Sequence, residues 1–84
     1  MDLVKARAVV ATALAAQTGA TPEEITPDQQ LAMIPGIESV RILRAVVRIE
    51  DEFDIAIPDD FLFETATVQQ LVELVAKLVE KGRR

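Results

Sequence analysis

The sequence predicts an all-α fold, a small bundle of three main helices with a short helix before the last one. Apolar residues recur at helical spacing in three stretches, residues 2–18, 39–53 and 67–82, and this spacing is typical of helices that bury one face. Residues that favour the starts and ends of helices border each stretch. No part of the chain shows the alternation of apolar and polar residues that indicates a half-buried strand.

The first helix is expected to run from about residue 2 to residue 18. Asp2 can cap its start, because a short acidic side chain accepts hydrogen bonds from the free N–H groups of a first turn. Gly19 can end the helix in a left-handed turn. The positions expected to face the core are Leu3, Ala6, Val10, Ala13 and Leu14.

A long connection, residues 19–38, follows the first helix. Thr21–Glu24 and Thr26–Gln29 both place a proline directly after a threonine and an acid or amide shortly after it, which is a pattern that starts helices. We therefore expect one helical turn at 26–29. Connections of this length are uncommon in small domains and are often functional. The residues expected to attach the connection to the core are Leu31, Met33, Ile34 and Ile37.

The second helix is expected over residues 39–53. A rotation of about 100° per residue places a broad apolar face toward the core and a stripe of arginines on the opposite side. Val40 and Val47 lie at the margin between the two. The apolar face consists of Ile42, Leu43, Val46, Ile49 and Phe53, and the stripe of Arg41, Arg44 and Arg48.

Residues 54–58 are expected to form a short extended link with Ile55 and Ile57 pointing inward. Pro58 can then start a brief helix that runs through Leu62. This is the short helix that completes the predicted bundle.

The last helix is expected to begin at Thr67, where Thr67 and Gln70 have the spacing of a capping box. Gly82 is expected to stop it. Its inward positions are Val68, Leu71, Val72, Val75, Leu78 and Val79.

Size and composition restrict what the chain can do. Its 84 residues suffice for one small domain, residues 1–84, and half of them are apolar. The absence of cysteine and histidine excludes disulfides, thiolate metal sites, cysteine nucleophiles and the commonest general base. No nucleophile with its base and no set of metal ligands is evident, and the acidic residues around Glu50–Asp60 lack the spacing of a calcium loop. We therefore expect neither an enzyme nor a metal site.

Charge and hydropathy exclude two further classes of partner. The formal net charge of −5 argues against nucleic-acid binding, which needs a basic surface. No apolar run approaches the length of a membrane span. Residues Met1–Arg7 also lack the basic and then apolar order of a secretory signal. We expect a cytoplasmic monomer that binds neither nucleic acid nor membrane.

The stretch Gly36–Val40 places Ser39 where a loop becomes a helix. Backbone N–H groups point outward at such a position, and the helix dipole is positive there, which suits a phosphate. Serine is also a preferred N-cap, so the local sequence alone allows a purely structural role. Ile42, three positions further on, supplies no carboxylate for a capping box. The two roles are compatible.

Three blocks of the chain resemble those of acyl carrier proteins. Gly36–Val40 resembles their modification site, in which a serine follows Gly-x-Asp and precedes Leu; Glu38 and Val40 stand at those two positions here. Residues 50–59 resemble the acidic end of the family's second helix and the Phe-x-Ile-x-Ile-Pro link after it. Residues 65–71 resemble the Thr-Val-x-x-Leu opening of the final helix. By the order and spacing of these blocks, the chain is identified as a member of this family.

The resemblance implies a carrier and not an enzyme. A phosphopantetheinyl transferase would attach 4′-phosphopantetheine from coenzyme A to the hydroxyl of Ser39, beside Glu38. The thiol of this arm would hold an acyl or polyketide chain as a thioester, and ligases, synthases or transferases would load and unload it. Two alternatives stay open: an aminoacyl or peptidyl carrier of a dedicated pathway, and an unmodified helical interaction module.

The resemblance also implies that the outward face of the second helix docks on partner enzymes. In fatty-acid carriers this face is mostly acidic, whereas Arg41 and Arg44 replace two acids here, which indicates a specialised member. Either the arginines are a solvated charged face, or the partners present acidic or mixed surfaces. Arg41 could also pair with the phosphate of the arm. The docking candidates are Val40, Arg41, Arg44, Val47, Arg48, Glu50 and Asp51.

A place for the cargo is expected near the adjacent residues 61–63, which are Phe, Leu and Phe. They either pack as a lid or border an acyl cavity of the kind that carrier bundles open between helices. The candidates for lining such a cavity are Val46, Ile57, Phe61 and Val75.

Overall fold

The computed structural model describes residues 3–34, 37–58 and 66–82, and at Ser39 the backbone alone. Three long helices carry the fold: α1 (Leu3–Thr18), α2 (Ser39–Phe53) and α3 (Val68–Gly82). Two short 3-10 turns, η1 (Pro22–Glu24) and η2 (Leu31–Met33), lie in the connection between α1 and α2. The predicted all-α class is confirmed. The short helix predicted after Pro58 lies outside the described residues from position 59 onward.

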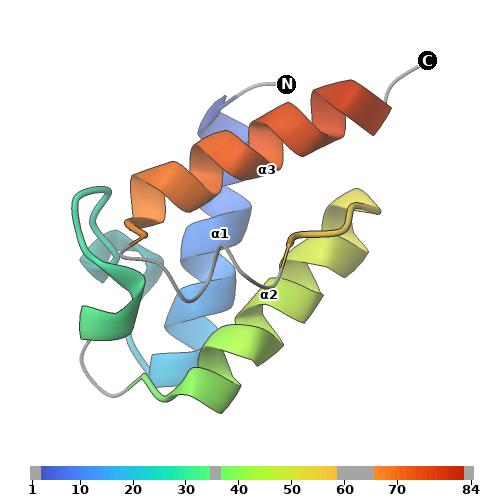
Figure 1. Ribbon diagram of the computed structural model, residues 1–84. Helices are drawn as coiled ribbons and strands as arrows, with labels where there is room; N and C mark the ends of the chain where they lie inside the picture. Colours follow the sequence, from blue (N-terminus) through green and yellow to red (C-terminus); the bar gives the residue numbers. More distant parts are fainter. Residues whose placement is uncertain (1–2, 35–36, 59–65, 83–84) are drawn as a thin grey trace.

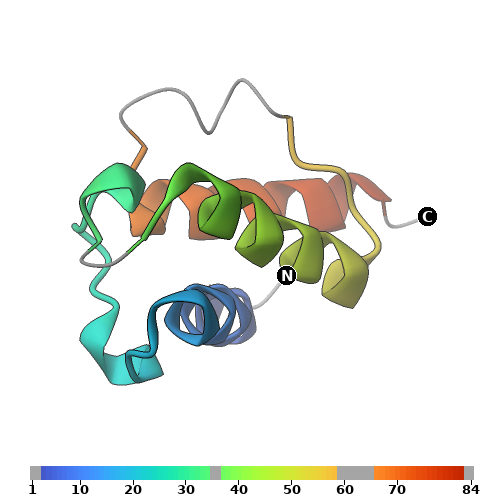
Figure 2. The same cartoon turned by 90° about the horizontal axis from the view of Figure 1, so that it is seen from below.

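α1 is the element on which the other two helices pack. α2 and α3 both make close contacts with α1 (Figure 1). Figure 2 looks nearly along α1 and shows α2 and α3 lying over the same side of it. Six residues of α1 are buried, and four of these are alanines, whose small side chains let the neighbouring helices approach closely. The six are Ala6, Val10, Ala11, Ala13, Leu14 and Ala15.

A single apolar core joins the three helices and the connection. The largest side chains that are fully buried include Leu14 of α1, Ile49 of α2 and Leu71 of α3. Ile25, Leu31 and Ile34 of the connection and Ile57 of the link after α2 are also buried. No buried polar or charged side chain occurs in the described ranges. The burial of apolar side chains is therefore what stabilises this core.

The ends of the helices follow from local chemistry. Gly19 adopts a left-handed conformation with φ of 75°, and its N–H donates to the carbonyl of Ala15 over 3.0 Å, as predicted for the end of α1. At the start of α3, the N–H of Gln70 donates to Thr67 Oγ1 over 3.2 Å and the N–H of Thr67 donates to Gln70 Oε1 over 2.8 Å. This reciprocal pair confirms the predicted capping box.

The long connection is hydrogen-bonded to the start of α3. The N–H of Leu31 donates to the carbonyl of Ala66, and the N–H of Val68 donates to the carbonyl of Gln29, each over 2.9 Å. The N–H of Gln69 donates to the carbonyl of Pro27 over 2.9 Å. These bonds satisfy N–H groups that a first helical turn leaves without a partner. The connection therefore holds α3 in place as well as linking α1 to α2.

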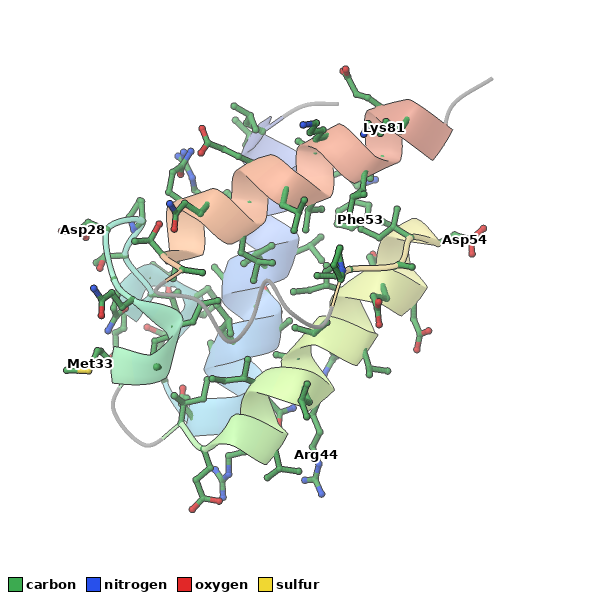
Figure 3. The ribbon with its side chains drawn as sticks, in the orientation of Figure 1. Asp28, Met33, Arg44, Phe53, Asp54 and Lys81 are labelled. Atoms are coloured by element: carbon green, nitrogen blue, oxygen red, sulfur yellow. The ribbon has the colours of Figure 1, made fainter. Side chains whose placement is uncertain are left out.

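Some expectations for local structure were wrong. The chain makes a turn at residues 27–28, where one turn of helix was predicted. Met33 is 69% exposed (Figure 3) because the 3-10 turn puts Leu31 and Ile34 on the buried side. Leu43 is 42% exposed because it lies about 100° around α2 from Ile42, at the edge of the buried face. Leu3, expected in the core, is 43% exposed.

Candidate functional site

The backbone at Ser39 begins α2. Glu38 is extended, with φ of −112° and ψ of 160°, and occupies the N-cap position that the sequence offered to Ser39. The carbonyl of Glu38 accepts the N–H of Arg41 over 2.9 Å and that of Ile42 over 3.0 Å. Ser39 therefore belongs to the first turn of a 15-residue helix. Such a turn has free N–H groups and the positive end of the helix dipole.

The backbone N–H groups of this turn can bind an anion such as a phosphate diester. The first turn of α2 contains no acidic residue that would repel an anion. Glu38 is exposed and directly precedes the turn. Just before it, the N–H of Ile37 donates to the carbonyl of Ile34 over 3.1 Å, and Ile34 is buried. Ile37 is thus bonded to a residue of the core, and residues 35–36 lie outside the described part of the chain.

Arg41 has an intramolecular partner that the sequence did not indicate. Its Nη1 donates to the backbone carbonyl of Gln17 over 2.8 Å. Gln17 lies in the last turn of α1, which contains no basic residue of its own. The guanidinium of Arg41 therefore caps the negative end of the α1 dipole. From the sequence, this side chain was expected either to be solvated or to dock on partners. The hydrogen bond to Gln17 was not foreseen.

The outer face of α2 carries a line of exposed apolar side chains. Val40, Leu43 and Val47 are 51%, 42% and 53% exposed. Their spacing places them on one side of the helix, with exposed Arg44 beside them. Figure 3 shows Arg44 extending away from the body of the protein. We call these four residues the α2 patch; sequence reasoning predicted all of them for docking except Leu43.

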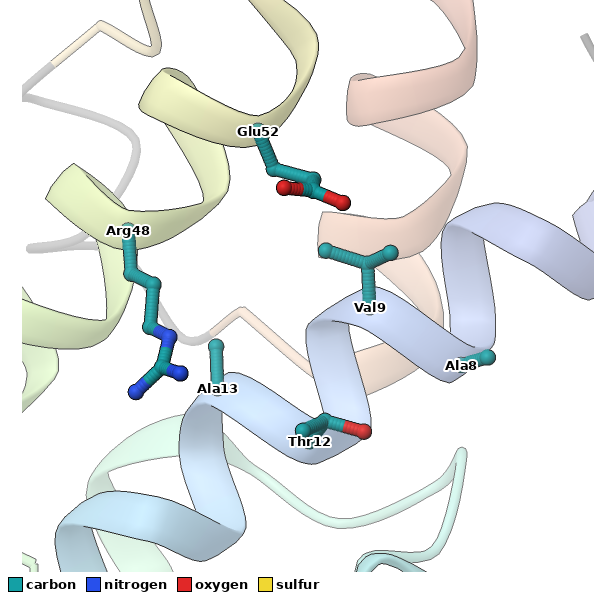
Figure 4. A pocket seen from close by; sticks show the side chains of 6 residues that line it. All are labelled: Ala8, Val9, Thr12, Ala13, Arg48 and Glu52. Atoms are coloured by element: carbon teal, nitrogen blue, oxygen red, sulfur yellow. The ribbon is translucent and has the colours of Figure 1, made fainter.

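Arg48 lies at the edge of α2 that is nearest to α1. Arg48 and Glu52 border a groove between the two helices (Figure 4). The groove has a volume of about 250 Å³, and its α1 side is lined by Ala8, Val9, Thr12 and Ala13. The small side chains of α1 leave this space open. Arg48 was predicted to share the docking face, and it lies one helical turn after Arg44, at the border of this groove.

Glu50 was also predicted for docking, and it is hydrogen-bonded within the fold. Its Oε2 accepts the N–H of Ile57 over 2.7 Å, which ties the link after α2 back to the helix. The turn between them needs Asp54 in a left-handed conformation, with φ of 55°, which aspartate tolerates. Asp51, the neighbouring candidate, is exposed. The two acids therefore differ in their contacts although they are adjacent in sequence.

The residues predicted to line a cargo cavity come from separate elements. Val46 of α2, Ile57 of the link and Val75 of α3 are all buried in the common core. Phe61 lies outside the described residues. A second groove, of about 330 Å³, lies on the other side of α1, next to η1, and no pattern in the sequence indicated it. Its lining includes Val4, Ala8, Ala11, Pro22 and Ile25.

The described residues lack the features of two other classes of site. Within these ranges, no group of three acidic side chains is close enough together to hold a metal ion. No helix there combines the length and the hydropathy that a membrane-spanning helix needs.

Comparison with known proteins supplies independent information. The family model for the phosphopantetheine attachment site matches residues 8–75. The chain is 34% identical over 65 residues to a meromycolate extension acyl carrier protein of Mycobacterium leprae, covering 77% of this chain and 56% of that protein. It is 29% identical over 77 residues to an acyl carrier protein of Syntrophobacter fumaroxidans, covering 92% of this chain and 95% of that one. The chain spans little more than half the length of the mycobacterial relative.

Proposed function

Because this chain belongs to the phosphopantetheine attachment-site family, whose prosthetic group is 4′-phosphopantetheine, we propose that it is an acyl carrier protein modified on the hydroxyl of Ser39. The family membership predicted from the sequence is thereby confirmed. Members of this family are carriers rather than enzymes, so none of the residues is assigned a catalytic role. Glu38, directly before the first turn, is proposed to lie beside the attachment point and to be recognised by the transferase.

The observation that carries this proposal is the position of Ser39 in the first turn of α2. The phosphate of the attached group is an anion, and the N–H groups and dipole of that turn favour an anion there. When bound, the group supplies a terminal thiol that can hold cargo as a thioester. The chain itself contains no cysteine to do so.

We propose the α2 patch as the surface that partner enzymes contact. Val40, Leu43 and Val47 present apolar area that water covers in the free protein, and Arg44 adds a positive charge at its edge. Desolvated apolar side chains supply most of the affinity of an interface, and charge sets encounter rate and partner choice. The partners are a phosphopantetheinyl transferase and the ligases, synthases or transferases that load and unload the arm, with acidic or mixed contact surfaces.

An acyl chain is the proposed cargo, because the relatives are acyl carrier proteins by name. Those names do not favour the aminoacyl alternative or the unmodified interaction module. The buried side chains of Val46, Ile57 and Val75 supply apolar surface from three elements. We propose that an acyl chain enters the core among them, and Phe61, outside the described residues, stays a candidate for lining its path. We further propose that residues 1–84 form a single carrier domain that works as a monomer in the cytoplasm.

Intact-mass measurement tests the attachment. The protein is incubated with coenzyme A and a broad-specificity phosphopantetheinyl transferase, and the mass should rise by one phosphopantetheinyl group. The Ser39→Ala variant should show no rise. Failure of the wild type to gain mass, or a gain that survives Ser39→Ala, would overturn the proposal.

A further inference from the structure

We propose that Arg41 is a positioning residue that holds the first turn of α2, and with it the attachment point at Ser39, against the end of α1. This inference rests on the proposed modification of Ser39. It assigns Arg41 a role inside the carrier, whereas its sequence position indicated contact with partners or with the arm's phosphate.

The bond from Arg41 Nη1 to the carbonyl of Gln17 joins residues 24 positions apart. Among the residues that the structure describes, it is the one side-chain hydrogen bond that connects α1 with α2. The carbonyls in the last turn of a helix have no partner within the helix. A cation beside them is also favoured by the negative end of the dipole.

The same arrangement explains why a cation occurs at the start of α2. A positive charge in a first turn is disfavoured by that helix's own dipole. The long side chain of Arg41 carries its charge away from that end and places it at the end of α1. One residue thus connects the two helix ends, and its backbone N–H is simultaneously bonded to the carbonyl of Glu38. Ser39 lies between Glu38 and Arg41, within the turn that this backbone bond closes and that the Arg41 side chain joins to α1.

Arg44 provides a matched comparison in the same helix. It is exposed, and the described part of the structure gives its side chain no hydrogen bond. If arginines on α2 act by docking alone, replacing either one should have the same kind of effect. If Arg41 positions the turn, its replacement alone should alter the turn.

The test combines amide hydrogen exchange with steady-state kinetics of loading by a phosphopantetheinyl transferase. In Arg41→Ala, the amides of Gly19 and Ile42 should exchange faster than in the wild type, and kcat for loading should fall about three- to tenfold with little change in KM. Arg41→Lys should recover part of both, because it restores the cation. Arg44→Ala should leave the exchange rates and kcat unchanged and raise KM, because it removes a charge of the α2 patch.

The inference would be overturned if the amide exchange rates and the loading kinetics of Arg41→Ala equalled those of the wild type. Equal effects of Arg41→Ala and Arg44→Ala on kcat and on the exchange rates would also overturn it. Should Arg41→Ala fail to fold, the exchange rates of Arg41→Lys and Arg41→Gln decide. Loss of the bond should leave faster exchange at Gly19 in Arg41→Gln than in Arg41→Lys, and identical rates in the two variants would overturn the inference. A wild type that is not modified on Ser39 would refute the proposed function, while the exchange comparison would still test the helix contact.

Discussion

The carboxylate of Glu50 and the backbone N–H of Ile57 form a hydrogen bond of 2.7 Å at the end of α2. The bond turns the link after α2 back toward the helix, and the side chain of Ile57 is buried in the core as a result. A charged acceptor makes such a bond stronger than one between neutral groups. Glu50 therefore belongs to the structure of the domain, whereas its neighbour Asp51 is exposed.

Glu50→Ala should lower the free energy of unfolding by about 1 kcal/mol, because it leaves the N–H of Ile57 without its acceptor. Asp51→Ala removes the same charge from the adjacent position and should change the free energy of unfolding by less than about 0.5 kcal/mol. Urea unfolding of the two variants measures the difference. Equal stabilities would contradict the role given to Glu50, and Glu50→Gln should retain part of the lost stability.

The exposure of Leu43 distinguishes two apolar residues that the sequence placed on one face. Ile49 is fully buried, so Ile49→Ala should cost about 2–5 kcal/mol through lost burial and the cavity left behind. Leu43→Ala should cost less than about 1 kcal/mol, since Leu43 is 42% exposed. Thermal or urea unfolding compares them, and a cost for Leu43→Ala close to that for Ile49→Ala would mean that Leu43 is packed in the core.

Glu24 should make stability depend on pH. Its carboxylate accepts hydrogen bonds from the N–H and the hydroxyl of Thr21, each over 3.0 Å, and these bonds lower the pKa of Glu24 below the ordinary value of 4.5. A lowered pKa in the folded state means that the carboxylate stabilises the fold above pH 4.5 and that this contribution is lost as the pH falls through the lowered pKa.

Glu24→Gln should therefore be less stable than the wild type at neutral pH, and the difference should shrink as the pH falls below that value. Unfolding curves measured from neutral to acidic pH check this. The control is Glu23→Gln, because Glu23 makes no side-chain hydrogen bond within the described ranges. A pH-independent difference between Glu24→Gln and the wild type would show that the carboxylate charge is not involved.

Charge reversal at Arg44 should affect association with partner enzymes and not the stability of the fold. Arg44→Glu should slow loading by an acidic-surfaced partner about three- to tenfold at low salt, because it removes attraction and adds repulsion. The effect should diminish at high salt, where exposed charges are screened. Lys77→Glu makes the same change on an exposed position of α3 and serves as the control. Equal slowing by both variants would indicate a general effect of net charge.

The apolar part of the α2 patch can be tested separately. Val47→Ser should weaken transfer of cargo between the carrier and its partners, seen as a higher KM, because buried interface contacts are lost. The melting temperature should change little, since Val47 is 53% exposed in the free protein. Val4→Ser, at a position that is 71% exposed on α1, is the matched control. A similar rise in KM for Val4→Ser would place the contact surface elsewhere.

Local sequence was enough to determine the helices of this protein. The spacing of apolar residues predicted α1, α2 and α3, and the pair Thr67 and Gln70 marked the start of α3, because these features act within a few residues along the chain. The blocks around Ser39 and Phe53 were likewise sufficient to indicate the family that the comparison then showed.

Only the tertiary structure decided what the polar side chains of α2 do. In sequence, Arg41 resembles Arg44 and Glu50 resembles Asp51, yet Arg41 bonds to the end of α1 and Glu50 to the link after α2. The exposure of Met33 and Leu43 was decided in the same way. The physical reason is that a helical pattern fixes the direction in which a side chain leaves its own helix, whereas the group it meets depends on where the other elements pack.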